Sequence, residues 1–254
     1  MLLVVLVAIG VPYFSIIATS LIRLRGYGLA AGNFTMDHYK ELLQTPKALA
    51  SIWKSLFLAA SSASICSVIG TAVVVAVRKS RGFFKKALEG ISLLPEMLPS
   101  IVLVIGLMLF WNWAYKVLPI YNTIWIMVLA YVVLYLPYTV QYVTSAFTQI
   151  NDSLLQAGRV FSGTPSYVFQ RVTLSMISRG IFAGWMMIFI IAFRELVTAS
   201  LIAPPNTLVV STYINREFEQ GSVSSGCAMA VLCVLITTTA LLVCNRLVGK
   251  RKGA

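Results

Sequence analysis

Long apolar runs alternate with shorter polar segments along this chain. Six of the runs are about twenty residues or longer, the length at which a helix crosses a hydrocarbon core of about 30 Å. We predict transmembrane helices over residues 2–22, 53–77, 91–114, 123–147, 180–203 and 225–245. Short segments of alternating hydrophobicity, which are typical of an outer-membrane barrel, are not visible. The pattern therefore predicts an all-α integral membrane protein with about six transmembrane helices.

A polar segment, residues 148–179, separates the fourth and fifth predicted helices. Residues 151–153, Asn-Asp-Ser, offer caps for a first short helix, and the Ser-Gly pair at 162–163 ends it. Thr164 followed by Pro165 is a favoured start for a second helix. The polar segment is therefore predicted to form a helical hairpin at the membrane surface.

Composition supports the membrane class. Hydrophobic residues make up 59% of the chain and charged residues 11%, whereas a soluble domain is about half apolar and about a quarter charged. The net charge is +12, and basic residues beside membrane helices meet the anionic headgroups of membrane lipids. No continuous basic face with interleaved aromatic residues is present, so we expect no nucleic-acid partner.

The distribution of Lys and Arg orients the predicted helices, because basic residues accumulate on the cytoplasmic side of a membrane. Twelve of the twenty fall on the side that holds both termini and the polar segment, and seven fall on the other, while Arg194 lies within a predicted helix. Both termini and the polar segment are therefore predicted to be cytoplasmic.

The cysteines and the histidine indicate neither a metal site nor a catalytic site. The four cysteines all fall within predicted membrane helices, without the spacing of a zinc site: Cys66, Cys227, Cys233 and Cys244. His38 is the single histidine, and we expect it to be solvated on an outer loop. We therefore predict no catalytic residues and no metal site.

The outer loop, residues 26–54, has an amphipathic middle. Phe34, Tyr39 and Leu42 alternate there with polar side chains such as Asp37 and Lys40. This pattern predicts a helix, which either lies in the membrane interface or contacts a soluble partner.

Glu96 lies between Pro95 and Pro99 in the third predicted helix. Proline removes a backbone hydrogen bond and kinks a membrane helix, and a kinked helix can act as a gate. The alternative is that Glu96 lies near the cytoplasmic boundary and pairs with Lys85 or Lys86 without touching a solute.

Arg194 and Glu195 lie within the fifth predicted helix. Charge at membrane depth is costly, so such residues usually face the protein interior or an aqueous path. The two side chains belong either to a translocation path or its gate, or to a structural buried ion pair. The apolar run that follows Pro204 and Pro205 is too short to span and predicts a re-entrant or interfacial segment.

The polar segment resembles the cytoplasmic loop of permease subunits from binding-protein-dependent ABC importers, whose consensus is E-A-A-x3-G-x9-I-x-L-P. By spacing, the consensus positions fall on Gln156, Ala157, Gly158, Ser162, Val172, Leu174 and Ser175. Residues 156–165 also look like the A-A-R-x-L-G-A-S-P run of that family, with Arg159 and Pro165 in register. Phe193-Arg-Glu-Leu is similar to the ferric-iron branch, in which an R-E-L triplet occurs.

The resemblance implies a single importer transmembrane domain over residues 1–254 of a bacterial cytoplasmic (inner) membrane protein. Its polar segment would couple to cytoplasmic ATPase subunits, which carry ATP and Mg. A second permease subunit or half and an extracytoplasmic solute-binding protein would complete the system. The implied coupling residues are Gln156, Ala157, Gly158, Arg159, Ser162, Gly163, Thr164 and Pro165. Because the chain lacks G-x-x-x-x-G-K-[ST], we expect it to bind no nucleotide or other cofactor and to be non-catalytic.

Ferric iron is the expected solute, with polyamine, thiamine, sulfate and phosphonate as alternatives. A secondary transporter would show internal repeats or several intramembrane carboxylates, and an intramembrane enzyme would cluster catalytic groups at one depth. These features are not evident in the sequence.

Overall fold

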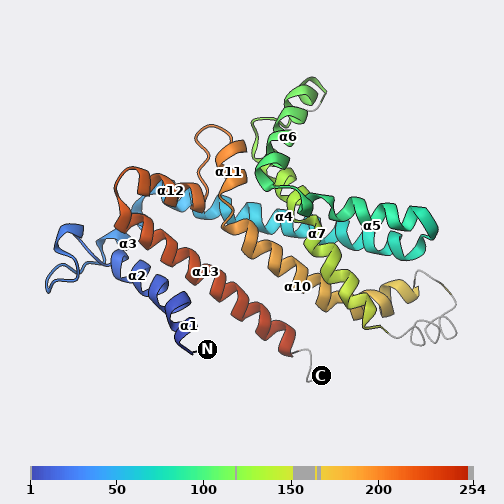
Figure 1. Ribbon diagram of the computed structural model, residues 1–254, viewed down its shortest axis with the longest axis horizontal. Helices are drawn as coiled ribbons and strands as arrows, with labels where there is room; N and C mark the ends of the chain where they lie inside the picture. Colours follow the sequence, from blue (N-terminus) through green and yellow to red (C-terminus); the bar gives the residue numbers. More distant parts are fainter. Residues whose placement is uncertain (1, 118, 151–163, 165–166, 251–254) are drawn as a thin grey trace. The chain divides into compact units, whose positions relative to one another are not determined.

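The computed structural model describes residues 2–117, 119–150, 164 and 167–250. Apart from one antiparallel bridge between Ile22 and Phe34, the regular structure of these residues is helical (Figure 1). The predicted all-α fold is therefore confirmed. The chain forms two compact units. Unit 1 consists of Met1–Phe57, Arg194–Ser200 and Pro205–Ala254, and unit 2 consists of Leu58–Phe193 and Leu201–Pro204.

Long apolar helices occur at the approximate positions of most of the six predicted membrane helices. Among the described residues, four are long and apolar enough to cross a membrane: α4 (Pro46–Lys79), α7 (Ile124–Thr148), the run Phe169–Phe193 formed by the π-helical turn η4 (Val168–Thr173) and α10 (Leu174–Phe193), and Val223–Cys244 of α13 (Val223–Lys250). A bent pair, α5 (Gly82–Met97) and α6 (Ser100–Trp113) with the short turn η3 (Ala114–Lys116), is a fifth candidate if it makes one crossing. A shorter apolar helix over Leu6–Ser20 lies within the first predicted span.

The third predicted helix, 91–114, is not continuous. α5 and α6 meet at an angle of 106°. Leu98 between them has an extended backbone, with φ −97° and ψ 142°. Pro99 explains this conformation, because the proline ring disfavours the helical region for the preceding residue. The predicted kink is therefore present, as a near-perpendicular break.

In unit 2, α7 packs against both α5 and α10, and α7 and α10 lie side by side in Figure 1. The part of α4 that belongs to this unit joins the same core. The core residues are apolar and come from α4, α7, the turn after α7, and α10: Val74, Val140, Val143, Phe147, Ile150 and Ile177. The Arg78 guanidinium lies 4.8 Å from the centre of the Phe147 ring. It therefore makes a cation–π contact with this core residue.

Unit 1 is built around α13. Its other elements are α1 (Leu2–Val5), the π-helical turn η1 (Leu6–Gly10), α2 (Val11–Ser20), the 3-10 turn η2 (Arg25–Tyr27), α3 (Asp37–Gln44), the start of α4, most of α11 (Val197–Ile202) and α12 (Val210–Glu219). α2, α3 and α12 all pack against α13. α3 is the helix predicted in the outer loop, and its Leu42 side chain is buried. His38 is only partly exposed, and its Nε2 atom lies 3.1 Å from the Ile22 carbonyl oxygen, so it is not simply solvated.

Candidate coupling and translocation site

The polar segment begins at the end of α7 and continues into η4 and the start of α10. Of the predicted coupling residues, Thr164 is described, and it is exposed. The others, and with them the predicted helical hairpin, lie outside the described residues: Gln156, Ala157, Gly158, Arg159, Ser162, Gly163 and Pro165.

Two glycines bring α10 against α7, the helices on either side of the polar segment. A Cβ atom at Gly180 would collide with the Ala146 side chain, and one at Gly184 would lie 3.3 Å from the Tyr142 Cβ and 3.4 Å from the Thr139 Cα. Small residues four apart allow membrane helices to approach closely. This Gly-x-x-x-Gly spacing is visible in the sequence and is the signal that could have predicted the contact. α7 and α10 therefore form a tightly packed pair.

A polar cavity lies between the same ends of α7 and α10. Its volume is 660 Å³. Tyr142, Ser145 and Gln149 line it from α7 and the residue after its end, and Ser175 and Arg179 line it from α10. The cavity therefore places hydrogen-bonding groups and one cation where the polar segment leaves the helices.

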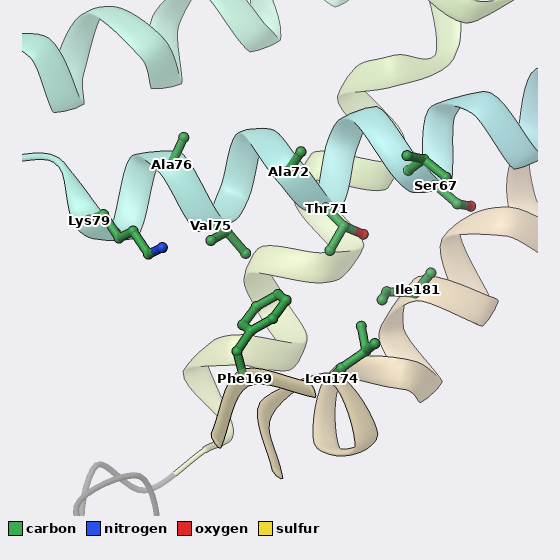
Figure 2. A pocket seen from close by; sticks show the side chains of 10 residues that line it. Ser67, Thr71, Ala72, Val75, Ala76, Lys79, Phe169, Leu174 and Ile181 are labelled. Carbon is green, nitrogen blue, oxygen red and sulfur yellow. The ribbon is translucent and has the colours of Figure 1, made fainter. Parts of the chain in front are cut away.

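A second cavity in unit 2 is apolar. It has a volume of 620 Å³ and lies between α4, η4 and α10. In Figure 2, Thr71 and Val75 of α4 lie across from Phe169, Leu174 and Ile181. The Thr71 hydroxyl is buried and has no hydrogen-bond partner among the described residues. With so few polar groups in its wall, this cavity is unsuited to carry a charged solute.

Glu96 lies in the last turn of α5, and its partner is on another helix. The Gln141 side-chain amide of α7 donates a hydrogen bond to Glu96 Oε2. Lys85 instead lies 3.9 Å from Glu89, one turn along α5. The structure therefore does not support the predicted pairing of Glu96 with Lys85, and it adds Gln141, which sequence reasoning had missed. Glu96 remains exposed beside the α5–α6 break.

Arg194 and Glu195 do not lie within a membrane helix, contrary to the prediction. The candidate span ends at Phe193, and both residues form a non-helical link before α11. Glu195 Oε1 accepts hydrogen bonds from the Thr198 backbone N–H at 3.1 Å and the Thr198 hydroxyl at 3.2 Å. The side chain thus caps the start of α11 and stabilises a separate helix after the link.

The link is also fixed to α12. The Ser211 hydroxyl donates a hydrogen bond to the Glu195 carbonyl oxygen. Arg194 is exposed. Glu195 is therefore held by its cap and by its backbone, whereas Arg194 presents its charge at the surface of unit 1.

Metal ligands do not gather in the part of the chain that the structure describes. No group of three His, Cys, Asp or Glu side chains there has the geometry to hold a metal ion. The four cysteines are free thiols.

The fold and these sites define a multi-pass, all-α integral membrane protein whose helices frame a polar connecting segment. Residues 68–253 match the sequence profile of a family described as "Binding-protein-dependent transport system inner membrane component". The chain belongs to this family. It is thus an inner-membrane component of a transport system, and its role is transport rather than catalysis.

Individual relatives are more distant. The chain is similar to the spermidine/putrescine transport system permease protein PotC of Haemophilus influenzae, with 21% identity over 96% of this chain and 92% of PotC. It is also similar to the putrescine transport system permease protein PotI of Escherichia coli, with 26% identity over 72% of this chain and 66% of PotI. A solved bacterial alginate ABC transporter, in complex with an alginate pentasaccharide-bound periplasmic protein, has a chain of the same fold. The TM-score is 0.80 at 16% identity, over 100% of this chain and 92% of that chain.

Proposed function

We propose that this chain is the permease subunit of an ATP-driven importer for a small cationic amine of the polyamine class. Both termini and the polar segment face the cytoplasm, where ATPase subunits carry ATP and Mg. A second permease subunit or half completes the path, and an extracytoplasmic solute-binding protein delivers the solute. In this proposal residues 1–254 act as one transmembrane domain that binds no cofactor of its own.

The glycine-mediated packing of α10 on α7 is the observation that carries the proposal. The polar segment connects these two helices, and Gly180 and Gly184 hold them in contact. A force on the polar segment is therefore transmitted to two helices together. Such rigid-body movement of packed helices is a known way to switch between two arrangements of a membrane domain. The coupling residues in the polar segment, Gln156 to Pro165, would receive this force from the ATPase.

The amine is favoured over ferric iron for two reasons. PotC and PotI are named as polyamine permeases. In addition, Glu96 supplies an exposed carboxylate beside the α5–α6 break, held by Gln141, and a carboxylate attracts an ammonium group. Glu195 supplies a second carboxylate at the end of a candidate span, with Arg194 beside it as a gate residue. Ferric iron stays a second candidate because of the Arg194-Glu195-Leu196 triplet.

Co-purification tests the importer class. The tagged protein is extracted from native membranes, and its partners are identified by mass spectrometry. An ATPase subunit should accompany the protein, and solute uptake should stop when ATP is depleted. Uptake that persists without ATP, together with no co-purified ATPase, would refute the importer and favour a secondary transporter.

A competition assay tests the solute. Uptake of labelled putrescine is measured in cells that express the complete system, with unlabelled spermidine, ferric iron, thiamine, sulfate and a phosphonate as competitors. Spermidine should compete, and the others should not. Competition by ferric iron alone would replace the amine with iron and leave the importer class intact.

A further inference from the structure

A small cavity in unit 1 gathers three basic side chains. It has a volume of 260 Å³ and lies between the start of α4, the link before α12, and α12 itself. Lys47 and Lys54 line it from α4, Arg216 lines it from α12, and Asn206 and Thr207 line it from the link. None of the lining residues is acidic. Within the described residues, these three cations also form no salt bridge.

The fold holds these cations together. Lys47 and Lys54 are seven residues apart on α4, which places them on the same face two turns apart. Ser55 is 2% exposed, and its Oγ accepts a hydrogen bond of 2.8 Å from the Val210 backbone N–H. This bond fixes the start of α12 beside α4 and so brings Arg216 to the cavity. Three like charges repel one another, so an anion in the cavity would stabilise this arrangement.

The surroundings of the cavity indicate the level of lipid headgroups. Trp53, next to Lys54, is 71% exposed, and Phe57, one turn further along α4, is also exposed. The continuous apolar part of α4 begins at the same point. Tryptophan at the end of an apolar stretch marks the membrane–water interface, and clustered basic side chains at this level attract anionic headgroups. The first turns of α4, which line the cavity, precede its apolar part. They therefore place the cavity at the level of the headgroups.

We propose that this cavity binds the phosphate of an anionic phospholipid such as phosphatidylglycerol. Its volume lies below the range of about 300–1,000 Å³ found for sites that hold a drug-sized ligand, so it suits one charged group better than a whole solute. Lys47, Lys54 and Arg216 attract the phosphate, and the Asn206 amide and Thr207 hydroxyl can donate hydrogen bonds to it. A choline headgroup would bring an ammonium group for which the cavity has no carboxylate.

This lipid site is independent of the proposed function. It requires neither a particular solute nor a particular orientation in the membrane. A cationic amine would be repelled by the same three charges, so the cavity is distinct from the translocation residues.

Native mass spectrometry tests the lipid site on the protein purified with its partner subunits. The protein is placed in nanodiscs of phosphatidylcholine with increasing phosphatidylglycerol, and the retained phosphatidylglycerol is counted. Lys54→Gln and Arg216→Gln should each weaken retention about fivefold, which corresponds to about 1 kcal/mol per charge. Lys54→Arg should retain the lipid, because it keeps the charge.

Lys116→Gln is the matched control. Lys116 is exposed near the exposed Trp113 at the end of an apolar helix, and it does not line this cavity. This variant should retain phosphatidylglycerol as the unmodified protein does. Equal losses in Lys116→Gln and Lys54→Gln would overturn the site, since any cation near the interface would then suffice.

Two further outcomes would also overturn the proposal. One is unchanged retention in the Lys54→Gln/Arg216→Gln double variant, with thermal unfolding confirming that the protein is folded. The other is normal lipid retention in the double variant together with loss of affinity for the solute-binding protein, which would assign the cavity to a protein carboxylate.

Discussion

Gly180 of α10 faces Ala146 of α7 so closely that no side chain fits between the two helices at this level. Gly184, one turn further along α10, makes the next close approach, to Thr139 and Tyr142. The ends of α7 and α10 on either side of the polar segment therefore pack closely because two positions of α10 have no side chain.

Replacing Gly180 with alanine should loosen this pair. The new Cβ would meet the Ala146 Cβ, which cannot rotate away, so the helices must separate. We expect the free energy of unfolding to fall by about 1–3 kcal/mol. Chemical or thermal unfolding of the purified protein in detergent measures the change.

Two variants control this experiment. Gly106→Ala in α6 adds a Cβ with nothing within 4 Å and should leave stability unchanged or slightly raised. Ala146→Gly combined with Gly180→Ala should recover part of the loss, because it removes the Ala146 methyl but leaves the Tyr142 carbonyl oxygen 3.0 Å from the new Cβ. Equal stability of Gly180→Ala and Gly106→Ala would refute the close approach.

Glu96→Gln should impair uptake of a cationic solute. The amide keeps the size of the side chain but removes the charge that would attract an ammonium group. We expect uptake of labelled putrescine to fall about tenfold, which corresponds to about 1.4 kcal/mol, at unchanged protein level in the membrane. Gln141→Leu removes the hydrogen-bond donor but leaves the carboxylate, so its effect should be smaller. Similar uptake in Glu96→Gln and the unmodified protein would exclude Glu96 from the path.

Glu195 allows capping and charge to be separated. Glu195→Gln retains a side-chain oxygen to accept the Thr198 N–H, whereas Glu195→Ala removes the cap. Loss of a helix cap costs about 0.5–2 kcal/mol, so the alanine variant should be less stable by about that amount. The glutamine variant should accumulate normally and show reduced uptake, measured beside its membrane level. Failure of the glutamine variant to accumulate would favour a structural ion pair.

Gly163→Leu tests the coupling role of the polar segment. A bulky side chain at this position should block close contact with the ATPase, so uptake and ATPase co-purification should both be lost. Membrane insertion should be normal, as judged by protease accessibility of the termini. Thr164→Ser, which keeps the hydroxyl of the predicted N-cap, serves as the control. Normal uptake by Gly163→Leu would place the coupling surface elsewhere.

The sequence predicted the membrane helices well because an apolar run is itself the physical signal for crossing a bilayer. It predicted a kink near Pro99 but not an angle of 106°, which depends on how both halves pack. The break at Arg194 was missed because the apolar run continues across it without Gly or Pro. The capping bonds from Glu195 to Thr198 stabilise a new helix after the link, and local hydrophobicity does not reveal them.

Contacts between distant residues were beyond local reasoning. Glu96 and Gln141 are 45 residues apart, and nothing in either neighbourhood specifies the other. The alternative pairing of Glu96 with Lys85 or Lys86 relies on nearness in sequence, and the structure pairs Lys85 with Glu89. The basic cavity was missed for the same reason. Arg216 and Lys54 line it from two helices that are distant in sequence, and the hydrogen bond between Ser55 and Val210 holds these helices together.

The end of α10 at Phe193 affects the electrostatic potential around the link that follows it. A helix that stops leaves its last carbonyl groups without partners inside the helix, and these carry about half a negative elementary charge. The negative pole of the α10 backbone dipole therefore lies beside Arg194, where the candidate span ends. The main chain thus partly offsets the charge of Arg194, and a substitution that removes this charge would leave a weakly negative helix end.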